Sequence, residues 1–575
     1  MKKVLFILLG CLLSFNVMAQ VKAISGLVTD VTGEPVIGAS VVEVGTTNGV
    51  ITDLNGKFSL KVAPNSQFLV SYIGYKQQTI KVGSESTYNI VLKEDAEVLD
   101  EVVVVGYGSQ KKVNVTGAVG MVGAEALEAR PVANASQALQ GVVPGLNLTV
   151  GNNGGALDGT LNMNIRGAGT IGDGSGSSPL VLIDGIEGDL NTVNPNDIES
   201  VSVLKDAASA SIYGARASFG VILVTTKSGK SGKTNVSYSG SARFSDAIGV
   251  PDIMDSYTFA QYFNRASANK GGGDIFAPAV MERIKAYQEG TLKATTVDNG
   301  AGIWQKWANA NGDTDWFEEF YDHWAPSQEH NLSINGGTDK TQYLISGSFL
   351  DQKGLMRHGK DKFQRYTLNG KITTAVTDWF KVTYSTKWTR EDFERPSYLT
   401  GNFFHNLARK WPVHPAYDPN GFPMDEGEVE QMENGGKQNS QKDFYTNQLQ
   451  LVFEPIKNWK INLDGSVRTT TQYQHWEVLP VYAYNVAGDP YYTVWDMGYG
   501  SYAAGSSRVN EYSWKENYYT TNIYSDYFKQ FDNGHYFKVM AGFNAELYKT
   551  RNITAEKNTL ITPGVPTINT ATDDP

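Results

Sequence analysis

Cysteine is almost absent from this chain of 575 residues, and the only one is Cys11. It lies in an N-terminal segment that we expect to be removed, so the mature chain would contain no thiol. This excludes disulfides, thiolate-bound metals and cysteine nucleophiles. Seven histidines are scattered without HExxH spacing, and neither a GxSxG motif nor a P-loop occurs. We therefore expect no catalytic residue, no metal site and no cofactor.

The sequence also lacks an excess of positive charge and a second long apolar run. It has 49 Lys and Arg against 60 Asp and Glu, a formal net charge of −11, and no basic patch interleaved with aromatic residues. This composition argues against nucleic acid as a partner. After Gln20 no segment approaches the roughly 20 apolar residues of a membrane-spanning helix. If the protein lies in a membrane, it must cross it as a β-barrel.

The N-terminal segment has the features of a secretory signal peptide. Two lysines precede the apolar run of residues 4–13, and small residues follow directly before Gln20. We predict a signal peptide over residues 1–19, with cleavage between Ala19 and Gln20. A lipoprotein-type cleavage before Cys11 is the alternative, but it leaves only ten residues for the basic and apolar regions together.

Residues 20–94 are predicted to form a small β-sandwich. Short β-branched runs alternate with turns rich in Gly, Asn, Asp and Pro, which is the spacing of a sandwich. The sharpest turn is Asn55-Gly56, which supplies the positive φ that a tight hairpin requires. We assign no chemistry to this domain, and we expect it to stabilise or space the chain. The predicted strands are residues 24–29, 39–44, 57–62, 68–72 and 87–92.

Residues 95–113 form a linker with an extended segment of unusual composition. It contains four consecutive valines, with acids before them and glycines after. Such a run favours a strand over a helix and can add to the exposed sheet edge of a partner. An edge strand of a neighbouring domain, or an aggregation-prone run, would have the same composition. The segment consists of Leu99, Asp100, Glu101, Val102, Val103, Val104, Val105, Gly106, Tyr107 and Gly108.

Residues 114–230 are predicted to form an α+β domain. A strand at 198–204 leads into a small-residue helix at 207–213, and glycines flank a second strand at 221–226. These three elements form a compact unit of two strands joined by a helix.

Other parts of this domain are predicted from glycine and proline. Residues 138–146 indicate a short helix that is stopped by Pro144 and Gly145 and followed by a strand, and strands at 162–167 and 179–185 end in glycine. Residues 167–172 satisfy GxGxxG, but the Gly/Ser stretch that follows cannot open the helix that a nucleotide site requires.

Residues 231–575 change to long alternating strands. One face is apolar or aromatic and the other is polar or charged, which is typical of a transmembrane barrel with aromatic girdles. A soluble sandwich is the alternative. All eleven tryptophans lie between Trp304 and Trp514. The clearest alternating segments are residues 235–244, 365–376, 380–388, 459–468 and 537–547.

Two segments, 246–329 and 390–445, are too long for the short turns of a barrel, and we predict surface loops there. Their aromatic residues lie among acids and amides, a combination that suits sugar rings. Packing of loop on loop explains the same residues equally well. The candidate ligand contacts are Trp304, Trp307, Trp316, Trp324 and Trp411.

In this order, the segments resemble the SusC/RagA-like branch of TonB-dependent outer-membrane transporters. Residues 20–94 resemble the carboxypeptidase-regulatory-like, transthyretin-like domain of that family, residues 197–229 the end of its plug domain, and residues 331–354 its early barrel. The resemblance implies that residues 99–108 are the TonB box. It also implies a plug signature of Arg166, Gly167, Asp184, Gly185, Lys205, Asp206, Ala207, Tyr213, Gly214 and Gly220.

The resemblance implies a transporter rather than an enzyme. It would lie in the outer membrane of a Gram-negative bacterium and import oligosaccharide, or peptide as the second choice, with a SusD-like surface lipoprotein as partner. Periplasmic TonB would displace the plug through the TonB box. A secreted glycan-binding or glycan-active β-rich protein is the alternative, because a carboxylate pair of glycosidase type is compatible with the sequence.

The predicted barrel is incomplete. We count about nine membrane-type strands, whereas large plugged transporters close with 22 strands. An open sheet would leave two edges unpaired in lipid. We expect the chain to be the front part of a longer transporter, and a truncated, non-functional remnant of a transporter is the alternative.

Overall fold

The computed structural model describes residues 22–572 except for residues 47, 65, 73–74, 94–101, 106–107, 112–117, 129, 131, 151–156, 158–160, 168–177, 494, 497–500, 503 and 532–534. The chain forms two compact units, residues 1–116 and 117–575. The predicted signal peptide with Ala19 and Gln20 lies outside the described residues. So do Leu99, Asp100, Glu101, Gly106 and Tyr107 of the predicted TonB box, and most of the GxGxxG stretch.

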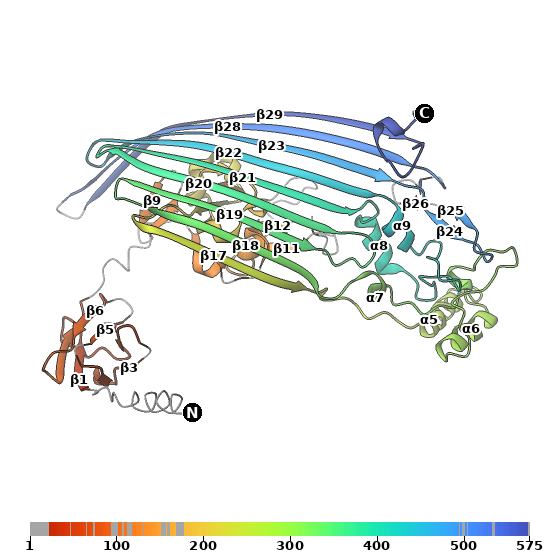
Figure 1. Ribbon diagram of the computed structural model, residues 1–575, viewed down its shortest axis with the longest axis horizontal. Helices are drawn as coiled ribbons and strands as arrows, with labels where there is room; N and C mark the ends of the chain where they lie inside the picture. The colour runs from red at the N-terminus through yellow and green to blue at the C-terminus, as the bar shows by residue number, and fades with distance from the viewer. Residues whose placement is uncertain are drawn as a thin grey trace, which may run out of the picture. The chain divides into compact units, whose positions relative to one another are not determined.

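The first unit contains a sandwich of two sheets (Figure 1) with strand orders β4-β1-β7 and β3-β2-β5-β6. All five predicted strands are present, and the burial of β4 alternates residue by residue, with Phe58 and Leu60 in the core. The prediction missed the short strands β3 and β6, which bury no residue completely. The bounds are β1 Lys22–Thr29, β2 Ser40–Glu43, β3 Gly49–Ile51, β4 Lys57–Val62, β5 Gln67–Ser71, β6 Gln78–Lys81 and β7 Thr87–Val91.

The valine run forms a strand, as predicted. It is β8 (Val102–Val105), which pairs antiparallel with β9 (Gly108–Lys111) in a two-stranded hairpin.

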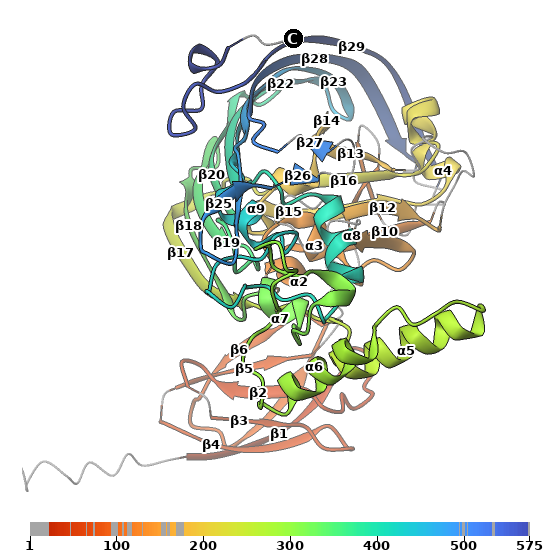
Figure 2. The same ribbon diagram turned by 90° about the vertical axis from the view of Figure 1, so that its right-hand side faces the viewer.

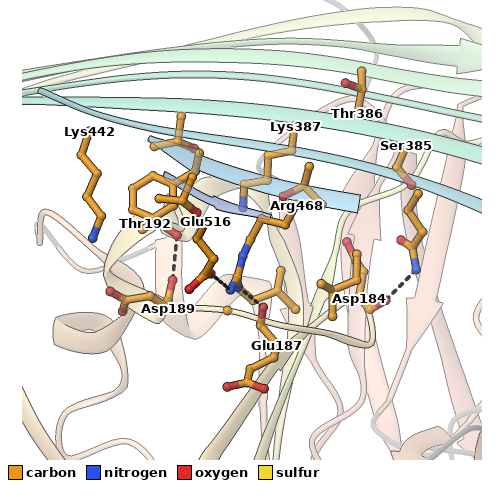
Figure 3. A pocket seen from close by; sticks show the side chains of 18 of the residues that line it. Asp184, Glu187, Asp189, Thr192, Ser385, Thr386, Lys387, Lys442, Arg468 and Glu516 are labelled. Carbon is orange, nitrogen blue, oxygen red and sulfur yellow. Dashed lines mark hydrogen bonds and ion pairs between the residues drawn. The ribbon is translucent and has the colours of Figure 1, made fainter. Parts of the chain in front are cut away.

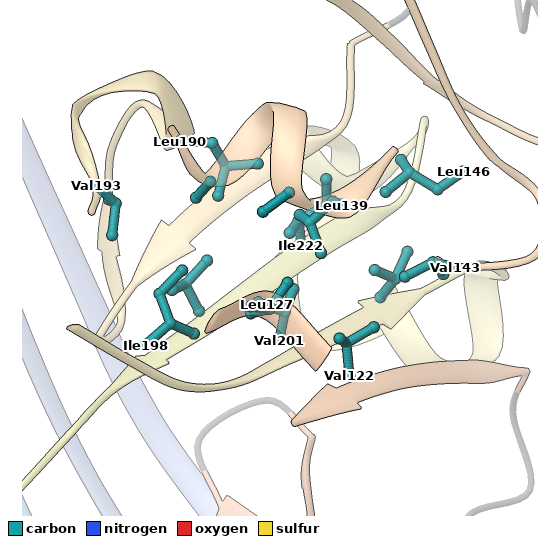
Figure 4. Close-up of a cluster of buried hydrophobic side chains, with 14 of the residues drawn as sticks. Val122, Leu127, Leu139, Val143, Leu146, Leu190, Val193, Ile198, Val201 and Ile222 are labelled. Atoms are coloured by element: carbon teal, nitrogen blue, oxygen red, sulfur yellow. The ribbon is translucent and has the colours of Figure 1, made fainter. Parts of the chain in front are cut away.

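The second unit begins with the α+β domain, whose sheet has the order β10-β15-β16-β13-β14. A second hairpin, β11-β12, and short helices cover it. Figure 4 shows the apolar core that these elements enclose, with Leu139, Ile198, Val201 and Ile222 fully buried. The strands are β10 Val119–Gly123, β11 Leu146–Val150, β12 Leu161–Ile165, β13 Leu180–Ile183, β14 Ile186–Glu187, β15 Ile198–Leu204 and β16 Val221–Thr226. The helices are α2 Ala124–Glu128, α3 Ala135–Leu139, η2 Leu190–Thr192, η3 Pro195–Asp197, α4 Ala207–Ala210 and η4 Ser211–Ala217.

The two strands predicted at 198–204 and 221–226 are confirmed as β15 and β16, but two helix predictions were wrong in their bounds. The helix predicted to run from Ala138 to the Pro-Gly stop is α3, which ends at Leu139 because Gln140 is extended, with a ψ of 121°, and Gly141 has a φ of 74°. The strand predicted after this stop is confirmed as β11. The helix predicted at 207–213 is divided into α4 and η4, and Gly214 inside η4 has a φ of 61° and a ψ of −146°.

The rest of the second unit is dominated by one antiparallel sheet of nine strands, in the order β17-β18-β19-β20-β21-β22-β23-β28-β29. We call it the wall sheet. In Figure 2 it curves around the α+β domain. Its strands are β17 Gly232–Ser245, β18 Ala325–Gly337, β19 Thr341–Lys353, β20 Lys362–Thr377, β21 Phe380–Pro396, β22 Lys437–Ile456, β23 Trp459–Val478, β28 Arg508–Gln530 and β29 Tyr536–Asn558.

Short turns join the wall strands at one end and long loops at the other (Figure 1). The loops hold α5 Ser256–Asn269, α6 Pro278–Gln288, η5 Trp307–Asn309, α7 Trp316–Phe320, α8 Gly401–Arg409 and α9 Val429–Asn434. They also hold β24 Tyr482–Tyr484, β25 Pro490–Tyr492, β26 Trp495–Asp496 and β27 Ser501–Tyr502, and η6 Ile568–Thr570 follows β29. None of the helices in the described part of the chain is long and apolar enough to cross a membrane.

The two faces of the wall sheet differ as the alternation predicted. Large apolar side chains on one face are exposed, among them Val236 (61%), Leu368 (54%) and Phe543 (63%). The opposite face carries polar residues such as Arg243 and Arg365, and these contact the α+β domain.

Candidate functional site

Two arginines of the wall sheet hold the α+β domain through its backbone. Arg365 on β20 is 2% exposed; its Nη1 donates to the carbonyl of Asn191 at 2.7 Å, and its Nη2 donates to the carbonyl of Ala133. Arg243 on β17 donates from Nη1 to the carbonyl of Val132 at 2.8 Å. A guanidinium keeps its charge and presents its donors in a rigid fork, which suits several fixed acceptors. Because these acceptors are backbone groups, the contact does not depend on the side chains that the α+β domain carries there.

Carboxylates and amides add bridges between the same two parts. Glu329 on β18 is 3% exposed and accepts from Arg243 Nη1 at 3.0 Å and from Asn194 Nδ2 of the α+β domain at 3.1 Å. Asp197 of the α+β domain accepts from Asn369 Nδ2 of β20 at 2.8 Å. These bonds show that the α+β domain and the wall sheet meet through hydrogen bonds and charge.

A cavity of about 310 Å³ lies between the α+β domain and the wall sheet (Figure 3). The turns around β14 and η2 form one side, and β21, β22, β23 and β28 form the other. Its charged lining residues are Asp184, Glu187 and Asp189 from the α+β domain and Lys387, Lys442, Arg468 and Glu516 from the wall sheet. The cavity therefore has carboxylates on one side and mainly cations on the other, with apolar residues such as Ile186 and Phe444 also in its lining.

The carboxylates of this cavity accept hydrogen bonds, whereas two of its cations donate none within the described residues, although Lys442 Nζ lies 4.8 Å from the ring centre of Phe444. Asp184 accepts from the backbone N–H of Thr226 at 2.9 Å and from its hydroxyl at 2.6 Å. Asp189 accepts from two N–H groups of its own turn, both at 2.9 Å. Lys387 and Lys442 make no hydrogen bond or ion pair with any residue that the structure describes. Their ammonium groups can therefore donate to a polar ligand.

Glu187 of the α+β domain contacts two strands of the wall sheet, β23 and β29. Arg216 of η4 pairs with Glu187 at 3.4 Å and also with Glu546 of β29. The hydroxyl of Tyr548 donates to Glu187 at 2.7 Å, and Arg468 of β23 donates to the carbonyl of Glu187. This ionic cluster ties the α+β domain to the part of the wall sheet farthest from β17.

The predicted plug-signature residues are distributed over the turns of the α+β domain. Arg166 and Gly167, with φ values of 61° and 100°, follow β12, and Asp184 and Gly185, with φ values of 50° and 86°, follow β13. Positive φ is uncommon outside glycine, so each pair marks a sharp turn at the end of a strand. These four residues therefore form the turns that follow β12 and β13.

Lys205 and Asp206 connect separate elements of the same domain. Asp206 precedes α4 and accepts from the backbone N–H of Ala118 at 2.7 Å and of Ser209 at 2.9 Å, and these hydrogen bonds hold the pKa of its carboxyl below the usual value. Lys205 Nζ donates to the carbonyl of Pro144 at 2.6 Å. The pair closes the junction between β15 and α4.

The remaining signature residues lie between β15 and β16. Ala207 begins α4, and Tyr213 and Gly214 lie in η4. Gly220 has a φ of 90°, and a Cβ there would lie 2.9 Å from the carbonyl oxygen of Leu204. Only glycine fits this close approach of two backbones.

The structure corrects the expectation that Trp316 offers a face to a ligand. Trp316 is 0% exposed; its indole N–H donates to the carbonyl of Trp411 at 2.9 Å, and Lys410 Nζ lies 4.7 Å from its ring centre. Trp411 packs on aromatic rings of α5, and Trp307 stacks on His414 with ring centres 4.5 Å apart. Both arrangements are loop-on-loop packing.

The other two candidate tryptophans differ in exposure. Trp324 is 67% exposed and stays a predicted ligand contact. Trp304 is half-buried, and its ring N–H is buried beside the loop that carries Asp418.

The sequence did not reveal the charged residues that organise these loops. His414 is fully buried, and burial holds its pKa well below the usual value. Lys410 Nζ pairs with Glu428 at 2.8 Å, with both side chains less than 9% exposed. Lys410 and Glu428 lie 18 residues apart in the loop between β21 and β22, a spacing that no regular element sets, so the sequence could not predict their contact.

His358 ties three loop elements together. Its Nε2 lies 2.8 Å from Glu319 of α7, and its Nδ1 lies 2.7 Å from Glu433 of α9. Burial opposes the charged imidazolium, but the hydrogen bonds to the two carboxylates outweigh this and raise the pKa of His358.

Two segments of the chain match known protein families. Residues 24–104 match the CarboxypepD_reg-like domain, and residues 111–221 match the TonB-dependent receptor plug domain. The chain is similar to the TonB-dependent receptor SusC of Bacteroides thetaiotaomicron, with 35% identity over 377 residues that make up 64% of this chain and 33% of that protein. It is also similar to the TonB-dependent receptor P39 of Formosa agariphila, with 32% identity over 71% of this chain and 36% of that protein.

The fold is similar to that of solved structures titled RagAB peptide importer. In the open-open state the TM-score is 0.63, with 23% identity over 82% of this chain and 52% of that chain. The chain spans about a third of the length of the curated relatives named above. Together with the family matches, this similarity confirms the predicted fold class: mainly β, with an N-terminal sandwich, an α+β domain and part of a large antiparallel barrel.

Proposed function

Because the chain belongs to the SusC/RagA-like TonB-dependent receptors, we propose that it takes part in nutrient uptake across the outer membrane of a Gram-negative bacterium. In this proposal the signal peptide of residues 1–19 exports the chain. The wall sheet forms part of a transmembrane barrel, and the α+β domain is the plug. Periplasmic TonB binds residues 99–108 and displaces the α+β domain.

The contrast between the two faces of the wall sheet carries this proposal. The outer face exposes large apolar residues, as lipid requires. The inner face contacts the α+β domain through hydrogen bonds and ion pairs, such as those of Arg365 and Glu329. Water can replace such bonds, so their net contribution is modest, and a domain held in this way can be displaced without exposing a large apolar surface.

We propose an oligosaccharide as the ligand and a peptide as the second class. The ammonium groups of Lys387 and Lys442 in the cavity suit a ligand rich in hydrogen-bonding groups, and the exposed Trp324 can stack on a sugar ring. The titles of the RagAB structures name a peptide importer, which supports the second class. A SusD-like surface lipoprotein would be the partner that delivers the ligand.

The role of the valine run can be tested by removing one backbone donor. In the β8-β9 register the N–H of Val103 points at Gln110, whereas that of Val104 points to the free edge of the hairpin. Proline has no N–H, so Val104→Pro blocks strand addition at this edge, whereas Val104→Ala keeps the N–H and serves as the matched control. We expect V104P in the bacterium that encodes the chain to abolish energised uptake of a panel of fluorescent oligosaccharides and casein peptides. Surface binding of the same probes should persist in de-energised cells.

The outcomes separate the parts of the proposal. Normal uptake by V104P would remove the TonB-box assignment while leaving the transporter intact. Recovery of the protein in the soluble fraction, rather than in outer membranes, would contradict the transporter itself and favour a secreted glycan-active protein. Uptake of peptides but not oligosaccharides would change only the ligand class.

A further inference from the structure

One rung of the wall sheet joins directly opposite residues across several strands. The β-ladder pairs Arg390 with Asp443, Asp443 with Thr471, Thr471 with Lys515, and Lys515 with Arg551. Directly opposite residues point to the same face of a sheet. At the β21-β22 end of the rung the two charges are opposite, whereas at the β28-β29 end they are alike.

The like-charged pair lies on the face directed away from the α+β domain. The neighbours of Arg551 in sequence alternate with residues such as Glu546 and Tyr548, which contact Arg216 and Glu187 of that domain. Lys515, Lys549 and Arg551 are all exposed, and we call these three residues the outer cationic cluster. The cluster therefore faces the surroundings of the wall sheet.

The cluster begins where the apolar band of these strands ends. On β29 the same face carries Phe537, Val539, Phe543 and Leu547, each at least half exposed, then Lys549 and Arg551, and a single exposed large apolar residue, Ile553, after them. The eleven residues from Phe537 to Leu547, in a tilted strand, cover about 25 Å, which is the height of the apolar band of a membrane barrel. The cluster thus lies at the membrane interface on the side of the long loops.

Other cations near this level have acidic partners. Arg390 pairs with Asp443 in two parallel bonds of 2.8 Å and 2.9 Å. Lys353 and Lys362 are also directly opposite each other, but Lys353 pairs with Asp322 at 3.1 Å and Lys362 with Asp351 at 3.3 Å. At these two places each cation of the sheet therefore has an acidic partner that balances its charge.

The outer cationic cluster has no such compensation within the described residues. Lys515 lies between Thr471 and Arg551, and neither Lys515 nor Arg551 makes an ion pair with a residue that the structure describes. The contact of Lys549 is with the ring of Tyr519, at 5.9 Å. Like charges directly opposite destabilise a sheet, so this arrangement is favourable when an anion lies between them.

We propose that the outer cationic cluster binds the phosphate group of an anionic outer-leaflet lipid. The position at the end of the apolar band places the acyl chains against Leu547 and Phe543 and the phosphate against Lys515 and Arg551. Each cation near an anionic membrane surface contributes to such attraction, and a phosphate accepts charge-assisted hydrogen bonds from both guanidinium and ammonium. The inference rests on the proposed outer-membrane location and is independent of which nutrient is imported.

The test compares lipid retained by the protein extracted from outer membranes in mild detergent. Native mass spectrometry of the wild type should show an adduct with the mass of a phosphorylated lipid. The double variant K515Q/R551Q should lose at least about 90% of this adduct, whereas K353Q/K362Q, which removes an equal charge at compensated positions, should retain it. Equal adducts in wild type and K515Q/R551Q would overturn the proposal.

Two further measurements identify the ligand and keep the test decisive if the double variant folds poorly. Purified lipid A should raise the thermal midpoint of delipidated wild-type protein, whereas phosphatidylcholine and inorganic phosphate should not. An equal rise with inorganic phosphate would contradict a lipid site.

Arg551→Glu places a carboxylate opposite Lys515. It should raise the midpoint of the delipidated protein and abolish the lipid A response. A lipid A response unchanged in R551E would also overturn the proposal, and absence of the protein from outer membranes would instead contradict the proposed function.

Discussion

The interior of the α+β domain and its contact with the wall sheet are built in different ways. The interior is apolar and fully buried, with Leu139, Val201 and Ile222 at 0% exposure. The contact with the wall uses arginines, carboxylates and amides that bond to backbone groups. Apolar burial makes the domain persist as a unit, while hydrogen bonds hold it in place with a smaller net free energy. The difference suits a domain that has to leave its position without unfolding.

The largest effect is expected in the interior. Ile222→Ala removes buried methyl groups from the central strand β16 and should lower the free energy of unfolding of the α+β domain by about 2–5 kcal/mol. Thermal unfolding followed by protease sensitivity of residues 118–230 measures this. Ile212→Ala is the matched control, because Ile212 is 37% exposed on η4 of the same domain, and it should cost less than about 1 kcal/mol. Equal losses in the two variants would contradict an apolar interior as the source of stability.

A smaller effect, and a different one, is expected at the contact. Arg365→Met removes both donors from the carbonyls of Asn191 and Ala133. Because water can replace part of what these carbonyls lose, we expect a total loss of about 1–3 kcal/mol in the free energy that holds the domain against the wall sheet. Hydrogen exchange should show faster exposure of residues 190–194 at low urea, while the exchange of β15 and β16 stays slow. The control is Arg265→Met on α5, which should change neither. If β15 and β16 exchanged faster as well, loss of the contact with the wall sheet would also unfold the interior of the α+β domain, which contradicts a domain that leaves its position without unfolding.

The sequence predicted the interior far better than the contact. The runs at 198–204 and 221–226 became β15 and β16 with the predicted bounds, because a buried strand is a local pattern of apolar residues. The alternation at Arg365 predicted correctly that this side chain lies opposite the apolar face. Its partners, however, are backbone carbonyls 174 and 232 residues away in sequence. Every residue has a backbone carbonyl, so the amino-acid type does not show which one accepts the hydrogen bond.

The loops show the same limit for side chains. The aromatic residues of the loops were predicted as candidate ligand contacts, yet Trp316 is buried beside Lys410. An aromatic residue among acids looks the same in sequence whether it packs on another loop or faces a ligand. Only the arrangement of the loops in space separates the two.

A third variant separates two causes of strain within the α+β domain. Gly220→Ala combines a φ of 90° with a Cβ that would lie 2.6 Å from Cδ1 of Ile165 and 2.9 Å from the carbonyl oxygen of Leu204. We expect a loss of about 1–3 kcal/mol in the free energy of unfolding. Gly141→Ala is the control, since its φ is 74° but no atom lies within 4 Å of the added Cβ, and its loss should be near the lower end of that range. Thermal unfolding compares them, and a larger loss in G141A would exclude close packing at β16 as the cause.

The smallest expected effect concerns the loops, where charge rather than apolar burial joins the elements. The pKa of His358 is raised by Glu319 and Glu433, so its ion pairs stabilise the loops fully below about pH 6.5, the pKa in the unfolded chain, and this contribution is lost as the pH rises through the raised value. The whole contribution of His358 to stability should be about 1 kcal/mol, because a partly buried ion pair of histidine stabilises a protein only slightly more than the median exposed ion pair does.

Protease cleavage within residues 354–361 should therefore increase with pH above neutrality in the wild type. His358→Gln keeps a hydrogen-bonding side chain but cannot be charged, so cleavage in this variant should be faster at low pH and independent of pH in the same range. His405→Gln, at an exposed position of α8, should leave the wild-type profile unchanged. If H358Q retained the pH dependence of the wild type, other titratable groups would cause it. The contacts of His358 with Glu319 and Glu433 would then stabilise the loops independently of pH, as apolar burial stabilises the interior of the α+β domain.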